Sequence, residues 1–294
     1  MLQRRRRRSS YGGLDSAVSF SARLIAAARA REAELGDAAL FTDPLAEHFA
    51  GEQALAQARS RTRNDGRIAV RTAFFDTALQ AALEAAPGAQ VVLLGAGLDS
   101  RAWRCSPPPG APLAAHVFEL DRSDVLAAKA ELLQSAPGGP PPLRLCKRYS
   151  PVVSDVTDPA WSAALALAGH DALLPTVWLL EGLLYYLPAD AVPSLLQACA
   201  AASAPGSVLV ASCVNSGALA RAKQSQSPAM RSFQSAIDAP AAFFAASGWR
   251  TQVVARPGDA ECSFGGRHPP PPPVASLENL RSAAAFYVRA ALAV

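Results

Sequence analysis

The sequence predicts an α/β protein built on a mostly parallel β-sheet with helices on both faces. From residue 90 to residue 255, short apolar segments alternate with longer helical patterns. This order is expected of repeated strand–helix units. The first strand segment is continuously apolar from Val91 to Leu94, as in strands that are buried on both faces. The 294 residues, half of them hydrophobic, can form a single domain with a substantial core.

Three helices are expected before the sheet. Residues 16–35 place their apolar side chains on one side of a helix and their charges on the others. Asp43 followed by Pro44 is typical of a helix start, and the second helix should run through Phe49 toward Ala58. Residues 68–86 carry an apolar stripe at helical spacing. These helices should form a cap that precedes the sheet.

The rest of the chain alternates between strands and helices. Strands are expected at 90–94, 116–120, 149–154, 175–180, 207–213 and 249–255, and helices at 123–133, 158–168, 189–202 and 240–247. Residues 215–238 have no clear pattern, 257–274 form a proline-rich loop, and 282–292 fit a helix or a strand. We therefore expect a basic tail (1–14) and one domain (15–294), made of a helical cap (15–86), a core (87–255) and a loop with a C-terminal element (256–294).

Charge and composition exclude several classes of protein. Five of the 28 basic residues are Arg4 to Arg8, so the other 23 nearly balance the 24 acidic residues. A nucleic-acid-binding surface is not indicated. No apolar run approaches the length of a membrane span. The five cysteines form no CxxC pair, which favours reduced thiols over disulfides or zinc. No metal is expected.

The arginine-rich tail has two interpretations. It contains serine and no acidic residue, as at the start of a plastid or mitochondrial transit peptide. The simpler interpretation is a solvated arm on a cytoplasmic protein.

An unusual residue follows each of four predicted strands: Gly95, Asp121, Asp155 and Glu181. Because the carboxyl ends of parallel strands meet at one edge of a sheet, ligands bind there. This repeated placement predicts a ligand site at that edge.

Two glycines, Gly95 and Gly97, form a turn after the first strand, where a ligand can approach the backbone closely. A tight strand–helix connection is the alternative. Ser100 replaces the third glycine of the G-x-G-x-x-G dinucleotide pattern, which disfavours NAD and allows a cofactor without phosphate.

Carboxylates at the strand ends suit a nucleoside. Asp121 can accept hydrogen bonds from a ribose diol; Glu119 competes for this role, and capping of the following helix is the alternative. Asp155 can face an exocyclic amine such as adenine N6, or it can stabilise a turn. Glu181 should lie near the ligand's charged end. Arg71 can bind a ligand carboxylate in bidentate fashion or lie on a solvated helix face.

Together these segments resemble the leucine carboxyl methyltransferase-like family, in its bacterial-type branch. The resemblance covers about residues 21–254. It rests on Arg71–Asp76 (RTAFFD), Val92–Arg104 (VLLGAGLDSRAWR), Val117–Asp121 (VFELD), Ser154–Asp158 (SDVTD) and Trp178–Pro188 (WLLEGLLYYLP).

The resemblance implies a Rossmann-like fold with a seven-stranded sheet, an N-terminal helical cap and S-adenosyl-L-methionine as cofactor. It implies these roles: Arg71 at the cofactor carboxylate, Gly95 and Gly97 at its methionine portion, Asp121 at ribose, Asp155 and Val156 at adenine, Glu181 near the amino group, and Tyr185 or Tyr186 beside the methyl-transfer site. The family's phosphatase-directed branch has a lysine on the first helix, which has no clear counterpart in Ser21-Ala22-Arg23.

We expect a methyltransferase that methylates a carboxylate oxygen on a small molecule or a protein. A carboxylate is ionised at pH 7 and needs no strong general base, and the sequence offers no compelling base. The alternatives are a catalytically silent cofactor-binding protein and an NAD(P)-dependent oxidoreductase.

Overall fold

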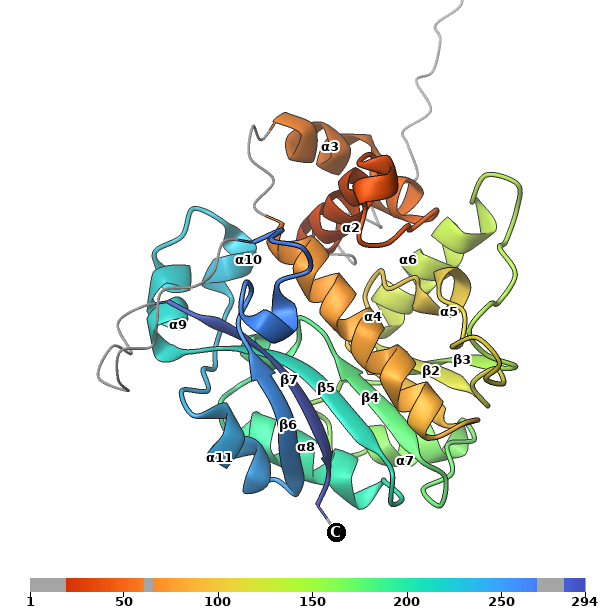
Figure 1. Cartoon of the computed structure of the whole chain (residues 1–294), viewed down its shortest axis with the longest axis vertical. Coiled ribbons are helices and arrows are strands. Elements are labelled where there is room, and N and C mark those ends of the chain that lie inside the picture. Colours follow the sequence, from red (N-terminus) through yellow and green to blue (C-terminus); the bar gives the residue numbers. More distant parts are fainter. Residues whose placement is uncertain (1–19, 61–65, 269–282, 294) are drawn as a thin grey trace, which may run out of the picture.

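A seven-stranded sheet forms the centre of the protein. The computed structural model describes residues 20–60, 66–268 and 283–293. The strands follow the spatial order β3-β2-β1-β4-β5-β7-β6 (Figure 1). All neighbouring pairs are parallel except those made by β7, which is antiparallel to β5 and β6. The strands are β1 (Gln90–Leu94), β2 (Val117–Asp121), β3 (Tyr149–Val153), β4 (Thr176–Leu180), β5 (Val208–Val214), β6 (Trp249–Ala255) and β7 (Ala285–Leu292).

Helices cover both faces of this sheet. They are α2 (Phe20–Ala33), α3 (Ala46–Ser60), α4 (Arg67–Ala85), α5 (Arg101–Arg104), α6 (Ser123–Gln134), α7 (Trp161–Leu167), α8 (Ala191–Ala201), α9 (Ser216–Lys223), α10 (Pro228–Arg231) and α11 (Pro240–Ala245), with 3-10 turns η2 (Gly36–Ala38), η3 (Leu184–Tyr186) and η4 (Ala260–Cys262). In Figure 1, α2 and α3 lie above the sheet and α4 crosses its front. None of the helices in the described part of the chain is long and apolar enough to cross a membrane.

The alternation of side chains along the strands builds two hydrophobic layers. In β1, Val91 and Leu93 pack into one layer, which includes α4 and the cap helices α2 and α3. Val92 and Leu94 pack into the other, which includes α7, α8 and α11. Successive side chains of a strand point to opposite faces, so a strand covered on both sides must be apolar throughout, as β1 nearly is.

Several sequence-based expectations are resolved here. Residues 282–292 fitted a helix or a strand, and 285–292 form β7 within the sheet. The unassigned region 215–238 holds α9 and α10, whereas α5 was not predicted. The second helix begins at Ala46 rather than at Pro44, and Gly51 (φ 70°) bends it. The basic tail (1–14) and the proline run (269–273) lie outside the described residues.

Candidate active site

A cavity of about 970 Å³ opens at the carboxyl ends of β1, β2 and β4. The order of the strands reverses here, because β2 and β3 follow on one side of β1 and β4 then lies on its other side. Ligands of open α/β sheets bind at such a switch point. Seven of the residues predicted from the sequence line the cavity: Arg71, Gly95, Gly97, Asp121, Glu181, Tyr185 and Tyr186.

The glycine turn brings the backbone to the cavity surface. Gly95 and Gly97 have φ values of 65° and 49°, in the region that favours glycine. A Cβ atom on Gly95 would lie 2.8 Å from Leu183 Cδ1. At Gly97, the nearest neighbouring atom to such a Cβ would be Gly95 O at 4.0 Å. A side chain at Gly97 would therefore occupy cavity space that a ligand could use.

Asp121 is fixed at the end of β2 by the backbone. Its Oδ2 accepts a hydrogen bond from Gly97 N and its Oδ1 from Arg122 N, both at 2.8 Å. Burial raises its pKa, although these N–H donors oppose the shift. The competing candidate, Glu119, is fully buried in an ion pair with Lys129 Nζ at 2.5 Å and is not among the cavity-lining residues. Asp121 is thus the carboxylate of β2 that reaches the cavity.

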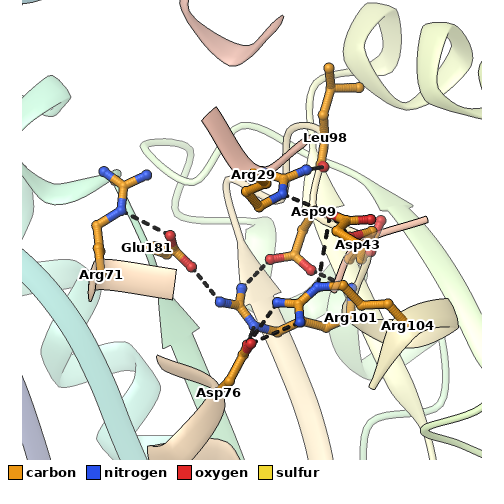
Figure 2. Close-up of polar contacts among 12 residues, drawn as sticks. Arg29, Asp43, Arg71, Asp76, Leu98, Asp99, Arg101, Arg104 and Glu181 are labelled. Atoms are coloured by element: carbon orange, nitrogen blue, oxygen red, sulfur yellow. Dashed lines mark hydrogen bonds and ion pairs between the residues drawn. The ribbon is translucent and has the colours of Figure 1, made fainter. Parts of the chain in front are cut away.

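Glu181 and Arg71 form an ion pair in the cavity wall (Figure 2). Arg71 Nε donates to Glu181 Oε1 at 2.8 Å, and Arg71 Nη1 donates to the Tyr185 hydroxyl at 3.3 Å. Burial alone would raise the pKa of Glu181, but Arg101 and Arg71 outweigh it and hold this pKa below its usual value. A Cβ on Gly182 would lie 3.3 Å from the Tyr185 hydroxyl oxygen, so this glycine makes room for the tyrosine.

A buried ionic network behind the pair was not predicted. Arg101 has a side chain only 2% exposed. It donates through Nε to Asp76 Oδ1 at 2.7 Å, pairs with Asp99, and reaches Glu181 Oε2 at 2.7 Å (Figure 2). Arg104 makes two further hydrogen bonds to Asp76, at 2.8 and 2.7 Å. The network therefore connects α4, the glycine turn and the end of β4.

Two predicted residues lie away from this group. Asp155 and Val156 are not among the cavity-lining residues. Asp155 Oδ1 accepts hydrogen bonds from Thr157 N at 2.8 Å and Thr157 Oγ1 at 2.7 Å, which is the turn-stabilising arrangement considered as the alternative. Val156 packs at the edge of the second hydrophobic layer. Their contact with adenine stays a prediction.

The buried network predicts loss of stability in acid. Burial raises the pKa of Asp99, but Arg101, Lys129 and Arg104 outweigh it and lower the pKa to about 2. A carboxyl group with a depressed folded-state pKa stabilises the protein above its unfolded pKa of about 3.9, and that stability is lost as the pH falls toward the folded value. The free energy of unfolding should therefore decrease between about pH 4 and pH 2.

Urea denaturation at a series of pH values checks this. Asp99→Asn should make the decrease shallower, whereas Asp171→Asn, which changes an exposed aspartate, should keep the wild-type slope. An Asp99→Asn profile parallel to that of the wild type would contradict the assignment.

The strand order, the antiparallel β7 and the cavity at the switch point define a Rossmann-like fold of the methyltransferase type. Two solved structures share it. One is a protein from Thermobifida fusca, provisionally described as a methyltransferase, with 17% identity, a TM-score of 0.59 and coverage of 97% of this chain and 99% of that one. The other is a DUF574 family protein from Streptomyces avermitilis, with 16% identity, a TM-score of 0.54 and coverage of 95% and 99%.

The chain belongs to the leucine carboxyl methyltransferase family, whose model matches residues 22–200. A relative from Streptomyces coelicolor is 43% identical over 194 residues, covering 62% of this chain and 64% of the relative. A relative from Frankia alni is 43% identical over 180 residues, covering 57% and 59%. Both are provisionally named S-adenosyl-L-methionine-dependent methyltransferases. The chain thus spans about three fifths of the length of these curated relatives.

Proposed function

We propose that the protein is an S-adenosyl-L-methionine-dependent methyltransferase that acts on a carboxylate. The observation that carries the proposal is the single cavity shared by the glycine turn, Asp121 and the Arg71–Glu181 pair. Each group suits one part of the cofactor. The Asp121 carboxylate can accept hydrogen bonds from the ribose diol, the Arg71 guanidinium can bind the cofactor carboxylate, and the Glu181 carboxylate can bind the ammonium group. The open space beside Gly97 fits a ligand held against the backbone.

Each of these residues would bind a different part of the cofactor. Arg71 would hold the cofactor carboxylate, Glu181 the amino group, and Asp121 the ribose. When bound, the cofactor supplies an electrophilic methyl group on a positively charged sulfur. The cap helix α2 contributes Leu24 and Ile25 to the cavity wall, where apolar side chains exclude water and so favour a reaction in which charge is lost. Tyr185 and Tyr186 would border the acceptor.

Two carboxylates and one phenol of the cavity are poor bases, and Asp121, whose pKa is raised by burial, is assigned to the ribose. The lowered pKa values of Asp99 and Glu181 make both carboxylates weak bases. Burial raises the pKa of Tyr186 to about 12, so its phenol stays protonated at pH 7. An amine or alcohol acceptor needs a base, whereas an ionised carboxylate does not.

Calorimetry tests the cofactor assignment. S-adenosylmethionine and S-adenosylhomocysteine should each bind with one site per chain, and NAD should not bind, because Ser100 interrupts the dinucleotide glycine pattern. Absence of binding by both S-adenosyl compounds, or binding of NAD alone, would contradict the assignment.

Incubation with methyl-labelled cofactor and a panel of carboxylates tests the acceptor class. Mild alkali should release the label as volatile methanol, as expected of a methyl ester. Label that resists alkali would contradict carboxylate methylation while leaving the cofactor assignment intact.

A further inference from the structure

Ser100 occupies the position of the third glycine in the dinucleotide pattern, and its hydroxyl group has a specific partner. Ser100 precedes α5 as its N-cap residue but makes no side-chain hydrogen bond to that helix. Its Oγ instead donates to Asp43 Oδ2 at 2.6 Å. Asp43 lies on the segment between η2 and α3, far away in the sequence. The serine therefore connects the segment that follows the glycine turn to the cap.

Arg29 of helix α2 completes this connection. Its Nε donates to the same Asp43 Oδ2 at 2.8 Å, and its Nη2 donates to the carbonyl oxygen of Leu98 at 2.7 Å (Figure 2). Leu98 directly follows Gly97. One guanidinium thus bonds to both the cap loop and the backbone of the cofactor turn, and Arg29 itself lines the cavity.

The three side chains are buried, so these contacts are protected from water. The Asp43 side chain is fully buried, and that of Arg29 is 9% exposed. Burial alone would raise the pKa of Asp43, but Arg29, Arg104 and the Ser100 hydroxyl group outweigh it and keep the pKa below its usual value. Asp43 is therefore an ionised carboxylate at neutral pH, and hydrogen bonds to an ionised group are the strong ones.

We propose that Arg29, Asp43 and Ser100 form a latch that couples docking of the cap helices to the shape of the cofactor-binding turn. The inference rests on the proposed function, because it assumes that the turn binds the cofactor. The latch holds residues 98–100 in place from the cap side while Asp121 holds Gly97 from the sheet side. Its members are positioning residues. Cofactor affinity should consequently depend on a hydroxyl group at position 100.

Ser100→Ala and Ser100→Gly test the latch. Glycine restores the dinucleotide pattern but lacks the hydroxyl group, so both variants should weaken binding of S-adenosylhomocysteine about tenfold, which is within the range usual for coupling between two sites. The matched control is Ser207→Ala. Ser207 is 1% exposed like Ser100, and its Oγ donates to Ala204 O and accepts from Thr176 N. It precedes β5, at the other end of the sheet from the cavity.

A merely structural role would lower the melting temperature of both Ser100→Ala and Ser207→Ala without changing the dissociation constant of the folded protein. Calorimetric dissociation constants for Ser100→Ala within twofold of those of the wild type and Ser207→Ala would overturn the latch. Absence of S-adenosylhomocysteine binding by the wild type would instead contradict the proposed function.

Hydrogen exchange gives a second readout, and its first comparison uses the wild type alone. In the wild type, S-adenosylhomocysteine should slow amide exchange in α2 and α3, because occupation of the turn should stabilise the docked cap. Ser100→Ala should weaken this protection, and Asp43→Asn provides the same comparison if Ser100→Ala does not fold. Ligand binding to the wild type without any change in α2 and α3 would also overturn the latch.

Discussion

Asp121→Ala is expected to weaken S-adenosylmethionine binding about a hundredfold. A ribose diol can donate two hydrogen bonds to one carboxylate, and each bond to a charged group contributes about 1.5–3 kcal/mol. At the lower of these values, loss of both corresponds to about 3 kcal/mol, or two orders of magnitude in the dissociation constant. The carboxylate also accepts the hydrogen bond from Gly97 N, so the turn loses an anchor at the same time.

Calorimetry on the folded variant checks this result, with thermal unfolding as a test of integrity. Asp121→Asn keeps one acceptor oxygen and should lose less affinity than alanine does. Asp171→Ala removes an exposed aspartate whose Oδ1 accepts a hydrogen bond from Leu173 N, and it should bind the cofactor like the wild type. Unchanged affinity in Asp121→Ala would show that the ribose assignment is wrong.

Arg101→Met is expected to lower the free energy of unfolding by about 3–5 kcal/mol. Methionine has a similar reach but no charge, so three carboxylates, those of Asp76, Asp99 and Glu181, lose a cation that contacts them all. Removing one partner of a buried ion pair costs this much where a charge stays buried without compensation. Asp76 keeps Arg104 and Glu181 keeps Arg71, so the loss falls mainly on Asp99. Arg101→Lys should give an intermediate loss, since an ammonium group lacks the planar fork of a guanidinium.

Urea denaturation measures this loss as a lower transition midpoint with an unchanged slope. Arg59→Met is the control, because Arg59 pairs with Glu34 and Glu47 on the surface with half of its side chain exposed. Its midpoint should stay close to that of the wild type, as expected of solvent-exposed ion pairs. Equal midpoints for Arg101→Met and the wild type would contradict a stabilising role for the network.

Local patterns were sufficient to predict the strands on which the site depends. The bounds of β1 agree with the expected 90–94, and β2 is displaced by one residue from 116–120, because buried apolar runs bounded by glycine or aspartate are distinctive. The C-terminal strand was ambiguous between helix and strand. Its alanine-rich sequence suits both, and only pairing with β5 and β6 makes it a strand.

The candidate site was partly predictable for the same reason. Strand ends meet at one edge of a parallel sheet, so Gly95, Asp121 and Glu181 could be grouped without knowing the packing. The periodicity of a strand places Glu119 and Asp121 on the same side of β2. Only the packing of α6 shows that Glu119 forms an ion pair with Lys129, which leaves Asp121 as the carboxylate at the cavity.

The ionic network and the latch depend on contacts between distant segments. Asp76 lies on α4 and Arg101 on α5, and nothing in the spacing of the two residues predicts that they meet. The same holds for Asp43 and Ser100. Such pairs become visible only when the helices are placed around the sheet.

The position of β7 has a consequence for how the chain folds. Among the described strands, β6 hydrogen-bonds only to β7, which lies between it and β5. During synthesis β6 leaves the ribosome first and has no sheet partner until residues 285–292 follow. Until then β5 and β6 present open edges that can pair with other chains. The sheet is therefore completed when β7 inserts between β5 and β6. Its pairing with β5 is a long-range contact of the kind that slows folding.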